Sequence, residues 1–199
     1  MAVIRADLVD SLDAAMRVHR EMCDTVQRPA APAVVEFVDE LTRRHGFDSD
    51  DGGFLSADIE ADARGVLVPT WPGTARTNIR AVLELTMERG LAVLDAQTLR
   101  LYDPRGAIPL TLRLGDETIA PYLSPSLLAD LIARPVPRDP FFVAKREEQQ
   151  YIQALTPVGA APAVVEYRDG SADQHYRAET SDRDLVRDIV WAWARGSDE

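Results

Sequence analysis

The sequence of 199 residues contains a single cysteine, Cys23, and only three histidines, His19, His45 and His175. One thiol cannot form a disulfide within the chain, and it cannot build a zinc site that needs several cysteines. The three histidines are scattered, without the close spacing that a metal site requires. We therefore expect no metal and no cofactor. Because Cys23 falls on the apolar side of an expected helix, we also expect its thiol to be buried.

Motifs that mark the common enzyme classes are absent as well. The sequence has no Gly-x-Ser-x-Gly, no phosphate loop ending in Gly-Lys-Ser or Gly-Lys-Thr, and no dinucleotide fingerprint. The acidic run DSDDGG, from Asp48 to Gly53, resembles the start of a calcium loop. Its fifth position is Gly52 and its twelfth is Ile59, where calcium ligands belong, so we expect a solvated turn. These absences favour a protein that is not an enzyme.

Long apolar runs are also missing. No stretch approaches the ~20 apolar residues that a helix needs to span a bilayer. Near the start, Asp7, Asp10 and Asp13 interrupt the region where a signal peptide would need apolar residues. We expect no membrane association and a cytoplasmic location, which the lone thiol also favours.

Positive charge is outweighed by negative charge. The chain carries 22 Lys and Arg against 33 Asp and Glu, a formal net charge of −11. An acidic surface repels phosphate, which argues against binding to nucleic acid. It suits a protein partner with a basic surface, because complementary charge speeds encounter. The alternative is that the charge serves only solubility.

Apolar periodicity predicts an alternation of helices and strands. The expected helices cover residues 6–27, 33–45, about 77–89, 122–135 and 182–195. The expected strands cover residues 58–71, 91–95, 98–102, 108–114, 141–146, 150–155, 162–168 and 174–179. Ser124 is expected to cap its helix with Pro125 at the first position, and Ser181 is expected to cap the last helix.

These elements predict an α+β fold of two small modules, each a mixed or antiparallel sheet flanked by helices. The strand, helix and strand between residues 58 and 95 suggest a βαβ-like or split βαβ unit. We expect an N-terminal module over residues 1–115 and a C-terminal module over residues 116–199. The segment RPVPRDP, residues 134–140, is the best linker candidate because it contains three prolines.

One polar stretch stands out, VVEYRDGSADQHYRA at residues 164–178. The turn signal DGS predicts a hairpin, and alternation along its strands places Glu166, Arg168, His175 and Arg177 on one face. Three interpretations are open: a hairpin with charged cross-strand pairs, a binding surface, or a catalytic cluster. The third requires a nucleophile from elsewhere, since none is near in the sequence. The four residues are the partner-binding candidates.

Two segments carry a resemblance to known proteins: LAVLDAQTLRLYDP at residues 91–104, and QQYIQALTPVGAAPAVVEYRDGSADQHYRAET at residues 149–180. They resemble parts of small actinobacterial proteins, some of which look like immunity proteins of polymorphic toxin systems. In the first segment Ala96 stands where those proteins would have proline. The resemblance implies a non-catalytic partner-binding protein and assigns a role to no particular residue.

The sequence therefore predicts a non-catalytic, acidic protein-binding module, with an immunity-type inhibitor of a toxin as its most specific form. The alternative is a small enzyme or ligand-binding domain with a site at the seam between the modules. A chaperone-like or structural subunit of a larger assembly is a third hypothesis.

Overall fold

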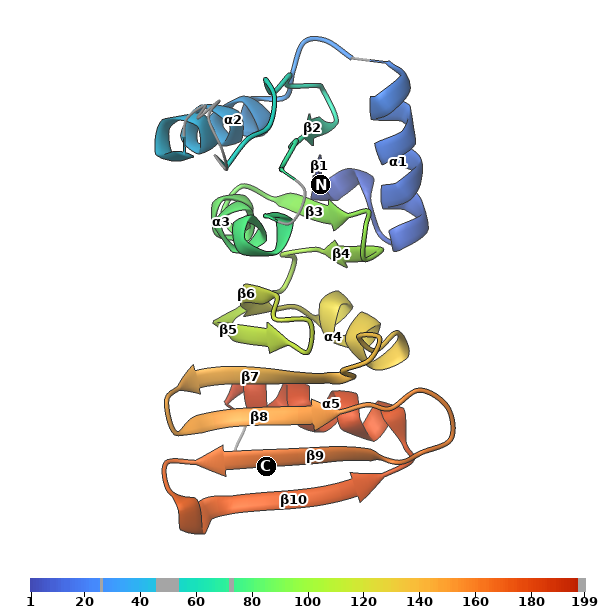
Figure 1. Cartoon of the computed structure of the whole chain (residues 1–199), viewed down its shortest axis with the longest axis vertical. Coiled ribbons are helices and arrows are strands. Elements are labelled where there is room, and N and C mark those ends of the chain that lie inside the picture. Colours follow the sequence, from blue (N-terminus) through green and yellow to red (C-terminus); the bar gives the residue numbers. More distant parts are fainter. Residues whose placement is uncertain (26, 46–53, 72–73, 197–199) are drawn as a thin grey trace. The chain divides into compact units, whose positions relative to one another are not determined.

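The computed structural model describes residues 1–25, 27–45, 54–71 and 74–196 (Figure 1). The chain divides into two units, Met1–Arg105 and Gly106–Glu199, which are considered separately below. Both units combine helices with an antiparallel sheet, so the predicted α+β class is confirmed. The acidic run at residues 48–53 lies outside the described residues.

The first unit is built on a sheet with the order β2-β1-β3-β4. Its strands are β1 (Ala2–Arg5), β2 (Gly65–Leu67), β3 (Leu91–Asp95) and β4 (Arg100–Tyr102). Strand β1 runs antiparallel to both β2 and β3, so β2 and β3 are parallel to each other with β1 between them. Helix α3 (Ala75–Met87) connects them. This arrangement is the split βαβ unit that the sequence predicts.

The central strand β1 is absent from the sequence-based assignment. Its residues Ala2, Val3 and Ile4 are completely buried. Such a short apolar run has no visible alternation, because both of its faces are covered, and periodicity does not identify it as a strand. Figure 1 shows α1 on one side of this sheet and α2 (Pro32–His45) and α3 on the other.

Helix α1 (Leu12–Asp24) is shorter than the predicted span of residues 6–27. It begins after Ser11, whose hydroxyl accepts a hydrogen bond from the Ala14 amide at 3.2 Å. Val18 and Met22 face the core beside Ile4 of β1. Cys23 is exposed, so the prediction of a buried thiol is wrong. The residue lies one position beyond Met22, which turns it away from the sheet.

The second unit is a six-stranded antiparallel sheet with the order β10-β9-β8-β7-β5-β6. Its strands are β5 (Ile108–Leu114), β6 (Ile119–Leu123), β7 (Phe141–Glu147), β8 (Gln150–Leu155), β9 (Ala163–Asp169) and β10 (His175–Thr180). All but β6 were predicted within a residue or two. In β6, Pro121 and the short length of the strand hide the alternation on which such a prediction depends.

The boundary between the units lies after Arg105, ten residues before the predicted one at residue 115. The physical reason is the pairing of β5, which is hydrogen-bonded to β6 on one side and to β7 on the other. The proline-rich segment 134–140 is not a linker between the units. It connects helix α4 (Pro125–Ala133) to β7 inside the second unit.

Helix α5 (Arg183–Arg195) covers one face of the second sheet. Val186, Val190 and Ala194 are its buried residues. Its C-terminal end is held by Arg146 of β7, whose Nη2 donates to the carbonyl oxygens of Trp193 at 2.5 Å and Ala194 at 2.8 Å. Figure 1 shows α5 lying behind β7, β8 and β9.

The N-terminal ends of α4 and α5 test the two caps that the sequence predicts. Ser124 accepts from the Leu127 amide at 3.3 Å with Pro125 at the start of α4, as predicted. The predicted cap of α5, Ser181, is wrong. Asp182 takes that place, because its carboxylate accepts from the amides of Asp184 at 3.0 Å and Leu185 at 3.1 Å.

Within the described residues, no helix combines the length and the apolar character that crossing a membrane requires.

The assignment of the α5 cap predicts a difference between two neighbouring variants. Asp182→Ala should lower the free energy of unfolding by about 1 kcal/mol, because two amides at the helix start lose their acceptor. Ser181→Ala should change it by less than about 0.5 kcal/mol, since Ser181 is exposed. Urea denaturation of both variants measures the difference. A larger loss in Ser181→Ala than in Asp182→Ala would contradict the assignment.

Candidate functional site

The second sheet has a face that the helices of its own unit leave uncovered. Side chains of strands β7 to β10 alternate, and those on the side of α5, such as Phe142, Ile152 and Val165, are buried. The opposite side is called the open face here. It comprises Phe141, Val143 and Lys145 of β7, Tyr151, Gln153 and Leu155 of β8, Val164, Glu166 and Arg168 of β9, and His175, Arg177 and Glu179 of β10. All of these residues are half-buried or exposed.

The structure brings the four predicted site residues together on the open face. Arg177 lies directly opposite Glu166, and His175 lies directly opposite Arg168. Glu166 is the centre of the group: its carboxylate lies 3.7 Å from Arg177 Nε and 3.7 Å from His175 Nε2. The division of the hairpin into one polar face and one apolar face is therefore as predicted.

The neighbouring strands add residues that the hairpin alone does not reveal. Gln153 of β8 donates to Glu166 at 2.5 Å. Phe141, Leu155 and Val164 form an apolar area beside this polar group, and Leu155 is 41% exposed. An open depression of about 390 Å³ lies where the two areas meet. The alternation within each strand is visible in the sequence, but the register that sets these strands side by side is not.

The open face carries charges of both signs. Lys145, Arg168 and Arg177 are positive, whereas Glu166 and Glu179 are negative. Arg177 Nη2 lies 2.8 Å from Glu179 of the same strand. Among the described residues, no group accepts a hydrogen bond from the buried Nε of Arg168. With three positive and two negative side chains, this face does not share the acidic excess of the whole chain.

The residue types on the open face limit the kinds of catalysis that it could support. It presents no serine, threonine or cysteine side chain in β7 to β10 that could act as a nucleophile beside His175. The ring of Tyr151 lies 6.4 Å from that of His175, in a tilted arrangement. Apolar and charged side chains lie next to each other on this face, a combination that is typical of protein interfaces.

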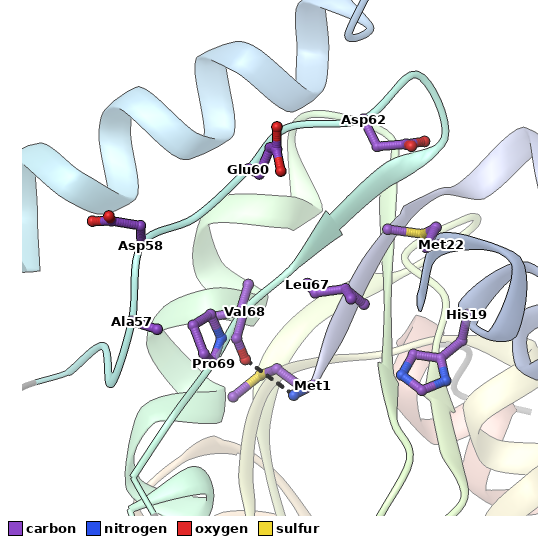
Figure 2. Close-up of a pocket in the computed structure, with 10 residues that line it drawn as sticks. All are labelled: Met1, His19, Met22, Ala57, Asp58, Glu60, Asp62, Leu67, Val68 and Pro69. Carbon is purple, nitrogen blue, oxygen red and sulfur yellow. Dashed lines mark hydrogen bonds between the residues drawn. The ribbon is translucent and has the colours of Figure 1, made fainter. Parts of the chain in front are cut away.

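A second hollow, of about 430 Å³, lies in the first unit (Figure 2). It lies among α1, the segment before β2, and β2 with the residues that follow it. Its lining residues are Met1, His19, Met22, Ala57, Asp58, Glu60, Asp62, Leu67, Val68 and Pro69. The amino group of Met1 donates to the carbonyl oxygen of Val68 at 3.1 Å, the dashed line in Figure 2.

Two of the three carboxylates in this hollow already have structural partners. Asp62 is buried, and it accepts from the Gln27 amide at 2.5 Å and from Arg64 Nε at 2.8 Å. Burial opposes its ionisation, but the hydrogen bonds from Arg64 and the Gln27 amide outweigh that effect and lower the pKa of Asp62 to about 2. Glu60 forms an ion pair with Arg28. These carboxylates hold the segment before β2 in place.

His19 is the titratable residue of the hollow that comes from α1. Burial lowers the pKa of its imidazole, and the positive Met1 amino group adds to that effect. Its Nε2 lies 3.9 Å from the Cys23 sulfur, one helical turn further on. Sequence reasoning missed this contact, although the spacing of four residues in a helix could have revealed it. In the part of the chain that the structure describes, no third group is recorded that orients His19 as a base would need.

Metal ligands do not gather at either place. Across residues 1–25, 27–45, 54–71 and 74–196, no three His, Cys, Asp or Glu side chains lie close enough together to hold a metal ion. Comparison of the chain with models of known protein families, with curated proteins and with solved structures found no match.

The lowered pKa of Asp62 predicts a loss of stability in acid. A carboxylate with a pKa of about 2 in the folded state and 3.8 otherwise stabilises the fold above about pH 4, and this contribution disappears as the pH falls through about 2. The free energy of unfolding of wild type should therefore fall by about 2 kcal/mol relative to that of Asp62→Asn between about pH 5 and about pH 2. Urea denaturation across this range measures that difference.

Asp58→Asn is the matched control, because it removes an exposed negative charge from the same segment. Its free energy of unfolding should stay within about 0.5 kcal/mol of the wild-type value. A constant difference between wild type and Asp62→Asn at every pH would show that the hydrogen bonds to Asp62 do not favour its ionised form.

Proposed function

We propose that the chain is a non-catalytic protein-binding module and that its partner docks on the open face of the second sheet. The observation that carries this proposal is the uncovered face itself. Half-buried apolar side chains such as Phe141 and Val164 lie beside Glu166 and Arg168 on a rigid antiparallel sheet. Interfaces combine an apolar centre with a polar rim in this way, and Tyr and Arg are enriched in them.

The shape of the face favours a protein over a small molecule. The depression of about 390 Å³ is open to one side, whereas a small ligand is usually held in a concave pocket that buries most of its surface. A face that presents Tyr151, Leu155 and Arg168 on the neighbouring strands β8 and β9 suits a partner surface of similar extent.

The charges define the partner more closely. The net charge of −11 favours a basic partner, and long-range attraction of that kind accelerates association. The open face itself carries both signs, so we propose a partner that is basic as a whole and places a carboxylate against Arg168.

The more specific proposal is an immunity-type inhibitor of a toxin in the cytoplasm. It is supported by the lone thiol and by the resemblance of residues 149–180 to parts of small actinobacterial proteins, some of which look like immunity proteins. Masking a basic toxin surface needs no catalytic group in the inhibitor. A toxin encoded beside this protein's gene is the first partner to test.

Capture of the partner tests the proposal when it is combined with two matched variants. Leu155→Asp places a charge in the apolar part of the open face and should weaken binding at least 10-fold, because the carboxylate is desolvated without a partner. Val158→Asp introduces the same charge in the loop after β8, where the side chain is 80% exposed, and should leave affinity unchanged. Calorimetric titration with the captured partner compares them.

Both variants are expected to keep the wild-type unfolding midpoint within a few degrees, since both positions are exposed. Equal affinity of Leu155→Asp and wild type for every captured partner would overturn the proposal. Loss of binding in Val158→Asp alone would move the interface away from the open face.

A further inference from the structure

The sheet of the second unit ends in an edge strand that neither a proline nor a bulge interrupts. Strand β10 is hydrogen-bonded to β9 on one side only, and five of its six residues are exposed, with Thr180 half-buried. It contains no proline, and its pairing with β9 shows no bulge. A regular edge of six residues offers unpaired amides and carbonyls to another strand.

The other sheet edges in the described chain have features that hinder pairing with a further strand. Strands β2 and β4 have three residues each, and β2 also meets Ala61 through an isolated bridge. Strand β6 carries Pro121, and its pairing with β5 shifts between Pro109 and Leu112. Short strands, prolines and bulges protect these edges, whereas β10 has none of the three and carries only charged side chains against unspecific pairing.

The sequence of β10 is complementary to itself. When two copies of one strand pair antiparallel around a two-fold axis, residues opposite each other must lie on the same face of their sheets. Two symmetric registers then pair five residues of each β10. One sets Arg177 against Arg177 of the second copy. The other sets Ala178 against Ala178, which places Arg177 opposite Glu179 of the second copy and Glu179 opposite its Arg177.

Electrostatics selects between these registers. Like charges directly opposite each other destabilise a strand pair, and opposite charges stabilise it. The first register opposes two guanidinium groups at its centre. The second creates two equivalent ion pairs on the open face, where Arg177 already contacts Glu166 and Glu179 of its own chain. The ring stack of Tyr176 on Tyr167, with centroids 4.7 Å apart, lies on the other face and is not disturbed.

We propose that this chain forms a symmetric dimer through antiparallel pairing of β10 with β10 of a second copy, with Ala178 opposite Ala178. The two sheets then become one continuous sheet, and the two open faces lie on the same side of it. This inference goes beyond the proposed function and does not depend on it, because it concerns the strand edge rather than the sheet face. An interface of one strand pair is small, so the dimer is expected to be weak and dependent on concentration.

Reversal of the charges at positions 177 and 179 tests the register. Sedimentation velocity up to a concentration on the order of 100 µM should show wild type as a monomer–dimer mixture. Arg177→Glu alone and Glu179→Arg alone should each be monomeric, since like charges then face each other across the axis. An equimolar mixture of the two variants should recover the dimer, and so should the double variant R177E/E179R.

The mixture also serves as the folding control, because a variant that had lost its fold could not recover the dimer. A monomeric wild type at the highest concentration would overturn the proposal. Dimerisation of either single variant to the wild-type extent would overturn it as well. A dimer that the double variant fails to recover would indicate the register with Arg177 opposite Arg177 and would equally contradict the proposal.

A disulfide cross-link between two copies locates the two-fold axis directly. In a Cys23→Ser background, which removes the exposed native thiol, Ala178→Cys should form a disulfide between two copies under mild oxidation, because opposite Cβ atoms in a strand pair lie about 4.5–5.5 Å apart. Arg177→Cys in the same background should cross-link much more slowly. The reverse order would contradict the proposed axis, and recovery of a β10 cross-link only with a different protein would replace the second copy by that protein.

Discussion

The antiparallel register of strands β7 to β10 is the constraint on which the second unit depends. Side chains of a strand alternate, so a single register assigns Phe142, Ile152 and Val165 to the side of α5 and leaves the residues between them for the other side. A slip by one residue would bury Glu166 and Arg168 beneath α5 and expose the core. The same alternation that stabilises the unit therefore creates its open face.

The candidate site and the core are two sides of one sheet, and this explains their different chemistry. Arg146 illustrates the division: it lies on the helix side of β7, where its guanidinium holds carbonyl groups at the end of α5 and lies 4.8 Å from the centroid of the Trp193 ring. Arg168 lies on the other side and keeps an Nε without an acceptor among the described residues. The first arginine stabilises the fold, and the second lies on the proposed docking face.

Sequence patterns predicted the fold where alternation or capping was visible, and missed it elsewhere. The alternating strand β5 and the proline-introduced helix α4 were recovered closely, whereas β1, which is buried on both faces, and β6, which contains Pro121, were not. The residues of the candidate site also fall into those that a local pattern identifies and those that it does not. Alternation grouped Glu166, Arg168, His175 and Arg177 correctly, because a hairpin brings close neighbours together, but Phe141 and Gln153 join them only through pairing between strands, which no local pattern encodes.

Side-chain footprinting by hydroxyl radicals, in the free protein and in its complex with the captured partner, tests the central claim most directly. Tyr151 and Phe141 lie on the open face, and Tyr176 lies on the opposite face with 49% of its surface exposed. A partner docked on the open face should lower the oxidation rates of Tyr151 and Phe141 and leave that of Tyr176 unchanged. Protection of Tyr176 together with unchanged rates at Tyr151 and Phe141 would contradict it.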